Sequence, residues 1–434
     1  MRILDQILTD DNLEKALKRV QRNKGASGID RMDVAELDEY FNEHKEEIKI
    51  SIREMRYEPR PVRRVYIPKK DGRKRGLGIP TVVDRVIQQA IAQVFETIYD
   101  PTFSGHSYGF RPNRSAHDAM EEVLGHLNEG YEWVIDLDIE KYFDTVNHDK
   151  LISCIREKVN EREVLHLIRR FLKAGVMENG MVEKSEIGTP QGGPLSPILS
   201  NIYLNKMDQE LESRGLRFVR YADDCDIFVK SEMAANRVMK SMTSWLERKL
   251  FLKVSATKTK VVRPTKSDFL GFTFWKRKDE WKSRPSEERK RNLYQKIREA
   301  TVRKREAAKT IGETIERVNQ IVRGWINYFR IGSIKIFVKE FGEWMRHKIR
   351  VIYFKQWKRP ETIYKNLAKL NTENRSRMSK KELFKTANTR LGLYRQAGMQ
   401  VANYVLSPKW LSEEKEDRPG LVDPLEYYLA RIHG

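Results

Sequence analysis

Several features that define other protein classes are missing from this sequence. Its 434 residues include only two cysteines, Cys154 and Cys225, too few for a disulfide framework or for a zinc site built from cysteine pairs. The eight histidines form no HExxH motif and no cluster with cysteine. Any metal should therefore be a hard cation held by carboxylates. No stretch approaches the ~20 apolar residues of a membrane-spanning helix.

The N-terminal residues also lack the marks of a targeting segment. MRILDQILTDDNLEKAL has neither the apolar core of a secretory signal nor the acid-poor, serine-rich composition of a transit peptide. We therefore expect the protein to remain where it is made, in a reducing cytoplasm.

Positive charge is what the sequence has in excess. It contains 83 Lys and Arg against 62 Asp and Glu, a net charge of +21, and such an excess predicts a polyanionic partner. A nucleic acid and a membrane surface both qualify. Because the basic residues are spread over the whole chain and no apolar anchor accompanies them, nucleic acid is the favoured partner.

Charge and predicted secondary structure differ between three regions of the chain. Residues 1–130 are basic and turn-rich, and residues 131–275 hold strand-like runs and acidic pairs. Beyond Pro285 the pattern is helical, and residues 282–360 contain 22 Lys or Arg against 8 Glu. There Thr310 and Glu313 have capping-box spacing, and apolar residues recur at helical spacing. They are Ile315, Val318, Val322, Trp325 and Phe329 in one predicted helix, and Phe337, Phe341, Met345, Ile349 and Ile352 in a second.

Two acidic elements carry the chemistry. The first is the predicted strand in EWVIDLDIEKYFDTV (132–146), where alternation directs Trp133, Ile135, Leu137 and Ile139 into a core and Val134, Asp136 and Asp138 to the other face. The second is LRFVRYADDCDIFVKS (216–231), which predicts a tight hairpin with Ala222, Asp223 and Asp224 at its tip. Each alone is typical of a solvated sheet face or turn. Together they can hold two Mg²⁺ ions about 3.5–4 Å apart, as in-line phosphoryl transfer requires.

At this point a family resemblance emerges. YADD (221–224), the DLDIEKYFD strand and the loop GTPQGGPLSP (188–197) resemble, in order and spacing, the palm motifs of reverse transcriptases. The whole chain resembles the reverse transcriptase and maturase proteins encoded by group II introns. The further motifs are NKGASGID (23–30), IPKKDGRKRGLGIPTVVDRVIQQAI (67–91), HSYGFRPNRS (106–115) and RGWINYF (323–329).

The resemblance implies an α/β right-hand polymerase, with fingers and an antiparallel palm sheet, followed by an α-helical thumb. Its expected domains are an N-terminal extension and fingers with the first part of the palm (1–130), the palm (131–280), the thumb or maturase domain (281–360) and a small DNA-binding segment (361–434). That last segment contains no cysteine and no HNH-type endonuclease motif, which many relatives carry. We therefore expect the form without the endonuclease.

The resemblance also implies roles for single residues. Asp138 and Asp223 bridge two Mg²⁺ ions, with Asp224 as a less intimate ligand, Ile139 beside the metals and Asp136 behind them. The expected nucleotide-binding residues are Lys69, Arg75, Phe143, Gln191 and Lys258. Among these, Phe143 would exclude a ribose 2′-hydroxyl and Lys258 would protonate pyrophosphate. The expected nucleic-acid-binding residues are Arg111, Arg114, Tyr221, Leu270, Gly271 and Arg323.

The predicted function is RNA-directed DNA polymerisation that copies group II intron RNA into cDNA, together with maturase binding of that RNA. The expected partners are the intron RNA template, a DNA primer or target and deoxynucleoside triphosphates, and a monomer is favoured. Three alternatives remain: a splicing-only RNA-binding maturase, a retron, diversity-generating or defence reverse transcriptase, and an RNA-dependent RNA polymerase. The intact acids oppose the first, RGWINYF the second and Phe143 the third.

Overall fold

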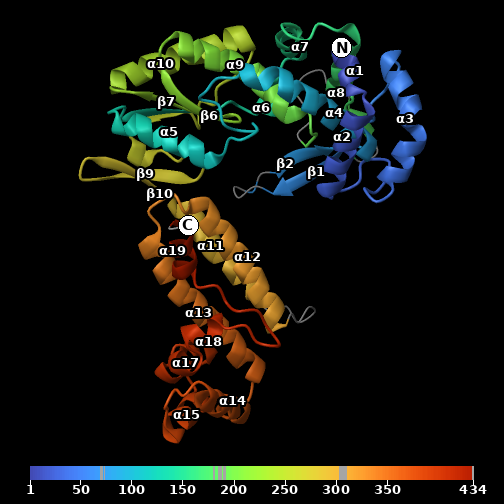
Figure 1. The fold of residues 1–434 in the computed structure, drawn as a ribbon. Coiled ribbons are helices and arrows are strands. Elements are labelled where there is room, and N and C mark those ends of the chain that lie inside the picture. The colour runs from blue at the N-terminus through green and yellow to red at the C-terminus, as the bar shows by residue number, and fades with distance from the viewer. Residues whose placement is uncertain are drawn as a thin grey trace. The chain divides into compact units, whose positions relative to one another are not determined.

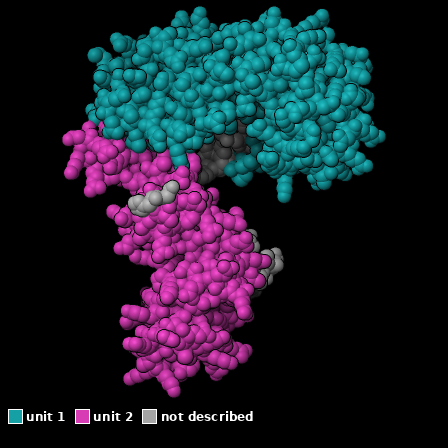
Figure 2. Space-filling model, in the orientation of Figure 1, with its two compact units in different colours: residues 1–267 teal, residues 268–434 magenta. Residues whose placement is uncertain are grey.

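The computed structural model describes residues 1–68, 72, 74–178, 181–183, 188, 192–302 and 310–432 (Figure 1). The chain forms two compact units, Met1–Ser267 and Asp268–Gly434, coloured separately in Figure 2. The four-part division predicted from the sequence is finer than these units and stays a prediction. Among the described residues, no helix has both the length and the apolarity needed to cross a membrane.

The first unit begins with helices packed beside a mixed sheet. The strand order of this sheet is β2–β1–β4–β5, with β1 antiparallel to β2 and parallel to β4. Thr9 and Thr81 cap two of the helices through their hydroxyl oxygens, as expected for residues that precede a first helical turn. The elements are α1 (Ile3–Ile7), α2 (Asp10–Arg22), α3 (Leu37–Arg53), β1 (Val62–Pro68), β2 (Lys74–Ile79), α4 (Val82–Tyr99), η1 (Asp100–Thr102), β4 (Val176–Glu178) and β5 (Met181–Glu183).

A second, antiparallel sheet carries the acidic residues. Its strand order is β6–β7–β3–β8, and helices complete this part of the unit. The elements are α5 (Ala116–Asn128), β3 (Trp133–Leu137), α6 (Tyr142–Thr145), α7 (His148–Arg156), α8 (Arg162–Lys173), α9 (Ser196–Ser213), β6 (Arg217–Tyr221), β7 (Asp224–Val229), α10 (Glu232–Trp245), η2 (Leu246–Leu250), β8 (Lys260–Val262) and η3 (Pro264–Lys266).

Alternation along β3 is confirmed with two exceptions, of which the first is Trp133, predicted to be buried but only half-buried at the start of the strand. Ile135, Leu137 and Ile139 are buried as predicted. Val134, on the other face, is also fully buried, which alternation alone did not predict. Val134 pairs in register with Phe228 of β7, whose ring lies 5.4 Å from the ring of His126 on α5. Helix α5 therefore covers this end of the second face, and the acids lie at the opposite end of the strand.

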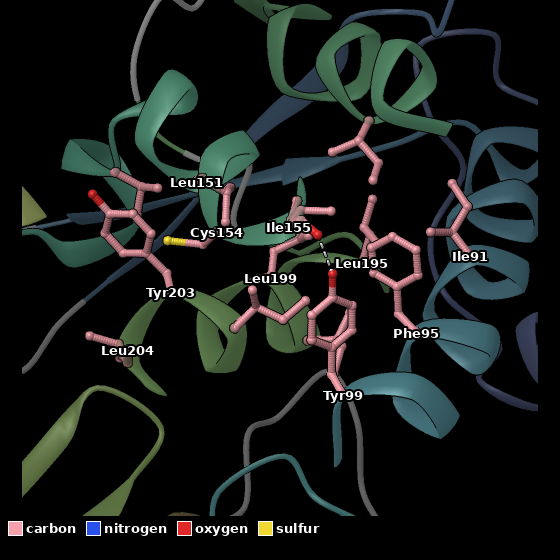
Figure 3. Close-up of a cluster of buried hydrophobic side chains, with 14 of the residues drawn as sticks. Ile91, Phe95, Tyr99, Leu151, Cys154, Ile155, Leu195, Leu199, Tyr203 and Leu204 are labelled. Atoms are coloured by element: carbon pink, nitrogen blue, oxygen red, sulfur yellow. Dashed lines mark hydrogen bonds between the residues drawn. The ribbon is translucent and has the colours of Figure 1, made fainter. Parts of the chain in front are cut away.

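The first unit has one extensive apolar core, part of which is shown in Figure 3. Side chains of α4, α7 and α9 meet there, and the Tyr99 hydroxyl donates to the Ile155 carbonyl at 2.6 Å. Cys154 lies within this core, where burial raises the pKa of its thiol. Its role is therefore packing rather than thiolate chemistry.

The second unit is helical apart from the hairpin β9–β10. The predicted capping box is confirmed, because Thr310 Oγ accepts from Glu313 N while the Glu313 carboxylate accepts from Thr310 N. Both predicted helices of this region are also present, as α12 and α13. The elements are β9 (Phe272–Arg277), β10 (Glu280–Pro285), α11 (Glu287–Ala300), α12 (Ile311–Phe329), α13 (Lys335–Trp357), α14 (Pro360–Glu373), α15 (Lys380–Ala387), α16 (Leu393–Ala397), α17 (Gln400–Val405), α18 (Pro408–Ser412) and α19 (Pro424–Ile432).

Candidate active site

The predicted carboxylates converge at one end of the antiparallel sheet. Strands β6 and β7 form the predicted hairpin, in which Tyr221 pairs with Asp224. Leu137 at the end of β3 pairs with Cys225 of β7. Because antiparallel neighbours run in opposite directions, Asp138 follows Leu137 at the level where Asp224 precedes Cys225. Residues more than eighty positions apart in sequence thus share one edge of the sheet.

The contacts of Asp138 favour a cation ligand. Its backbone N–H donates to Thr259 Oγ1 at 3.1 Å, and Lys258 Nζ donates to its Oδ2 at 2.8 Å. The other carboxylate oxygen, Oδ1, is buried and has no hydrogen-bond partner among the residues that the structure describes. Leaving a buried acceptor unsatisfied costs about 1–3 kcal/mol, and a bound cation would satisfy it. Ile139 can serve such a cation only through its carbonyl oxygen, since its side chain is apolar and buried.

The raised pKa of Asp224 at the hairpin tip also favours a bound cation. Desolvation, followed by the negative charges of Asp223, Asp136 and Asp138, raises the pKa of Asp224 to about 6. Burial makes the larger contribution, and the three neighbouring carboxylates add to it. A divalent cation would relieve this repulsion. The donor set therefore fits hard cations such as Mg²⁺, which prefer oxygen ligands.

Asp136 lies one step behind this edge. It pairs in register with Asp226 of β7, and its carboxylate lies 3.3 Å from Lys260 Nζ. Asp226 is buried, and desolvation together with the charges of Asp136 and Asp224 raises its pKa well above the usual range. Asp136 thus lies within the strand beside an acidic neighbour, whereas Asp138 follows the end of β3, and this supports the predicted place of Asp136 behind Asp138. Both acids have a lysine partner, so that pairing does not distinguish them. The sequence analysis did not single out Asp226.

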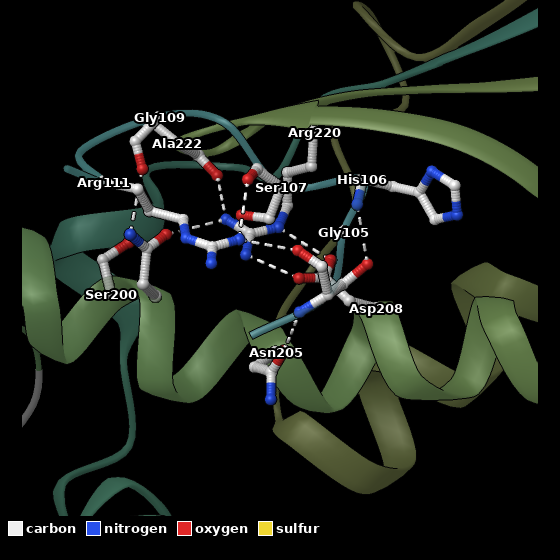
Figure 4. A network of polar contacts seen from close by, with 12 residues as sticks. Gly105, His106, Ser107, Gly109, Arg111, Ser200, Asn205, Asp208, Arg220 and Ala222 are labelled. Atoms are coloured by element: carbon white, nitrogen blue, oxygen red, sulfur yellow. Dashed lines mark hydrogen bonds and ion pairs between the residues drawn. The ribbon is translucent and has the colours of Figure 1, made fainter. Parts of the chain in front are cut away.

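A buried arginine holds the hairpin tip from beneath (Figure 4). Arg220 is fully buried, and its Nε and Nη2 donate to the two carboxylate oxygens of Asp208 on α9 at 2.7 and 2.6 Å. Its Nη1 donates to Asn201 Oδ1 at 3.0 Å and to the Ala222 carbonyl at 2.7 Å. The bidentate pair fixes the guanidinium, and the guanidinium fixes the turn that presents Asp223. Arg220 is thus a positioning residue that the sequence analysis missed.

The loop before α5 packs directly on the same turn. Tyr108 N–H donates to the Arg220 carbonyl, and Arg220 N–H donates to the His106 carbonyl, both at 2.9 Å. Asn201 Nδ2 also donates to the Gly109 carbonyl at 2.9 Å. A Cβ placed on Gly109 would lie 2.2 Å from Ala222 N. Only glycine permits this close approach, so the GFRPNRS segment supports the catalytic hairpin through its backbone.

Phe143 and Tyr221 lie near the carboxylates along the chain, and Lys258 lies beside Asp138 in space. Phe143 is half-buried on α6, and its ring meets that of Tyr142 edge-on at 5.1 Å. Tyr221 is half-buried at the end of β6. Lys258 pairs with Asp138, as described above, although its side chain is 57% exposed. Their predicted contacts with nucleotide or nucleic acid stay predictions.

The two arginines of GFRPNRS have interior partners. The Arg111 side chain is 5% exposed; its Nε donates to the Asp100 carboxylate at 2.6 Å, and its other nitrogens donate to backbone carbonyls. Because the guanidinium nitrogens are used in these bonds, which hold the loop, they argue against the predicted phosphate contact. Arg114 also donates to the Gly105 carbonyl, but it is half-buried over the Tyr108 ring and keeps a partly exposed surface.

The remaining predicted residues lie in the second unit or outside the described residues. Leu270 and Gly271 form a two-residue turn in which both have positive φ, and the Leu270 carbonyl accepts from the Tyr328 hydroxyl at 2.9 Å. Arg323 is exposed on α12. Lys69 and Gln191 lie outside the described residues, and for Arg75 only the backbone is described, paired with Ile67.

This chain matches two families of known proteins and resembles individual members of them. Residues 67–274 match the family described as reverse transcriptase (RNA-dependent DNA polymerase), and residues 290–371 match the maturase-specific domain of group II introns. Group II intron-encoded protein LtrA of Lactococcus lactis subsp. cremoris is 40% identical over 220 residues, which cover 50% of this chain and 36% of LtrA. Protein YkfC of Escherichia coli K12 is 32% identical over 300 residues, which cover 60% of this chain and 79% of YkfC. The chain thus spans about a third of LtrA.

Proposed function

The chain belongs to the reverse transcriptase family whose members carry a group II intron maturase-specific domain, and from this premise we propose that it copies group II intron RNA into cDNA. The observation that carries the proposal is the meeting of Asp138 with Asp223 and Asp224 at one edge of the sheet. The buried, unpartnered Asp138 Oδ1 and the raised pKa of Asp224 support a cation there. We place this activity in the bacterial cytoplasm.

The proposed chemistry assigns each residue a task. Asp138, Asp223 and Asp224 would hold the divalent ions, which we propose to be two Mg²⁺ ions, with the Ile139 carbonyl as a further ligand. When bound, such ions lower the pKa of a primer 3′-hydroxyl and neutralise the leaving pyrophosphate. Lys258, within reach of Asp138, would give a proton to pyrophosphate. Lys69, Arg75 and Gln191 would hold the incoming nucleotide.

Phe143 is proposed to select deoxynucleotides. It lies five residues after Asp138 and is half-buried, so its ring has support from the core on one side. A ring held in this way can exclude a 2′-hydroxyl by steric overlap, because a packed aromatic cannot yield without disturbing its neighbours. The edge-on contact with Tyr142 at 5.1 Å contributes to this support.

The second unit is proposed to bind intron RNA and to act as the maturase. Its match to the maturase-specific domain spans α11 to α14, and residues 282–360 carry 22 Lys or Arg against 8 Glu. Arg323, exposed on α12, is available for a phosphate. Affinity built on phosphate contacts falls steeply as salt concentration rises. This domain distinguishes the proposal from a retron or defence reverse transcriptase.

Primer extension on an RNA template with Mg²⁺ tests the polymerase proposal. We expect Asp223→Asn to abolish extension, because it removes a metal ligand while it keeps the shape of the side chain. Asp11→Asn, which changes an exposed acid of the first unit, should extend at the wild-type rate. Binding to intron RNA, measured by gel retardation, should be retained in both variants. Equal extension by wild type and Asp223→Asn would refute the polymerase assignment and leave the RNA-binding role.

A further inference from the structure

A second group of ligand-type side chains lies beside the hairpin, near the ends of β6 and β7 that are remote from its tip. His106 comes from the loop before α5, and Glu122 and His126 lie four residues apart on one face of α5. The two imidazoles and the carboxylate each direct one ligand atom inward, and these three atoms lie within 4.8 Å of one another. We propose that His106, Glu122 and His126 form a structural site for a zinc-class divalent ion.

The hydrogen bonding of the cluster is incomplete without such an ion. The His126 side chain is 7% exposed, and in the described part of the chain its Nε2 has no hydrogen-bond partner. The nearest carboxylate atom is Glu122 Oε1 at 3.5 Å, and the same oxygen is the partner of His106 Nδ1. Zinc bonds of about 2.0–2.1 Å in a tetrahedral arrangement separate ligand atoms by about 3.3 Å. The His126 to Glu122 separation therefore suits two ligands of one ion. His106 and Glu122 are joined by a short hydrogen bond and would have to move apart for both to bind the ion.

The surroundings supply what a metal site needs beyond its ligands. The Tyr108 hydroxyl donates to Glu122 Oε2 at 2.6 Å, which orients the carboxylate as outer hydrogen bonds commonly do. On the inner side, His106 lies 5.1 Å from the ring of Phe218 and His126 lies 5.4 Å from that of Phe228. These rings give the two imidazoles apolar neighbours on the sheet. The His106 side chain is 32% exposed, so one side remains open to entry and to a fourth ligand.

Ligand type sets the class of ion. Two imidazoles with one carboxylate suit Zn²⁺, Co²⁺ or Ni²⁺, whereas Mg²⁺ requires oxygen ligands and retains water. The site is therefore chemically distinct from the aspartates of the hairpin tip. Its effect would be to fasten the loop of His106, which hydrogen-bonds along β6 and carries Gly109 against the hairpin (Figure 4), to helix α5.

Cobalt titration of the full chain in excess Mg²⁺ tests this proposal, because Mg²⁺ occupies the carboxylate site while Co²⁺ reports imidazole ligation by its visible absorption. We expect one Co²⁺ per chain, displaced by Zn²⁺, and a rise in melting temperature on binding. Glu122→Gln and His126→Asn should abolish the absorption. His117→Asn, on the same helix but outside the cluster, should preserve it. Tyr108→Phe should weaken binding on the order of tenfold to a hundredfold, the usual effect of losing an outer hydrogen bond.

The possible failures can be distinguished. Absence of cobalt absorption in the wild type, or equal absorption in wild type and Glu122→Gln, would overturn the site. If His126→Asn does not fold, Glu122→Gln still decides, because the amide retains the volume of the carboxylate and can accept from Tyr108. Circular dichroism of each variant verifies its folding before titration. The result does not depend on polymerase activity, so the proposed function and the metal site can fail separately.

Discussion

Gly109→Ala should disable the catalytic hairpin without touching a catalytic residue. The added Cβ would lie 2.2 Å from Ala222 N and 2.9 Å from the Tyr221 carbonyl carbon. Cβ contacts under 3.0 Å essentially never occur in proteins, so the loop and the hairpin must separate by at least about 0.8 Å to relieve the overlap. The hairpin cannot move alone, because Arg220 holds the Ala222 carbonyl at 2.7 Å and is itself fixed by Asp208.

The geometry gives the size of the effect. A displacement of about 1 Å at a catalytic group can slow chemistry about a hundredfold, which corresponds to about 2.7 kcal/mol in the activation free energy. Overpacking of this kind also lowers the free energy of unfolding by about 1–3 kcal/mol. We therefore expect Gly109→Ala to remain folded at moderate temperature, with a single-turnover rate of nucleotide addition reduced about a hundredfold. Affinity for primer–template should change little.

Gly105→Ala is the matched control, since it lies in the same loop and a Cβ there meets nothing within 4 Å. Rapid-quench measurement of one nucleotide addition, with saturating primer–template and deoxynucleotide, separates chemistry from binding. Urea denaturation of both variants reports stability. A Gly109→Ala protein that adds a nucleotide at the wild-type rate would refute the argument that this contact positions the hairpin. Equal loss in Gly105→Ala would trace the effect to the loop in general.

Three further outcomes are expected. Because the folded-state pKa of Asp224, about 6, exceeds its ordinary value of 3.8, this group lowers the free energy of unfolding as pH rises from about 4 to 6. Metal-free Asp224→Asn should therefore melt above wild type at neutral pH, with a difference that vanishes toward pH 4; the opposite trend would contradict the shift. Asp208→Asn leaves Arg220 buried and unpaired and should cost about 3–5 kcal/mol in urea denaturation, whereas Asp11→Asn, in an exposed pair, should cost at most about 1 kcal/mol. Phe143→Val should admit ribonucleotides in primer extension, and unchanged sugar selectivity would remove its assigned role.

Local pattern was enough to identify the hairpin, the strand before Asp138 and two helices of the second unit, α12 and α13. Alternation, turn residues and capping depend on neighbours within a few positions, so they can be recognised from the sequence alone. The capping box of Thr310 and Glu313 is an example, since both hydrogen bonds join residues three apart. The motif order that indicated the family is likewise a property of the chain as written.

The choice between Asp138 and Asp136 required more than alternation, which places both on one face. Motif resemblance favoured Asp138, and the structure supplies a physical reason. Within the described part of the chain, Asp138 Oδ1 is buried without a partner, while Asp136 lies inside the strand and faces Asp226. For Arg111 the motif and the structure disagree. The motif indicated a phosphate contact, but in the structure the Arg111 guanidinium donates to the carboxylate of Asp100, eleven residues earlier.

The sequence by itself determined the positive charge, the acidic residues and the elements with a clear local pattern, such as the hairpin of Asp223, because these depend on composition and short-range spacing. Only the tertiary structure decided which polar side chains are buried and with whom. Arg220 meets Asp208 and Ala222, Gly109 meets the hairpin backbone, and His106 meets Glu122. Such pairings arise when separate elements pack against one another. The periodicity of the sequence therefore does not predict which side chains will meet.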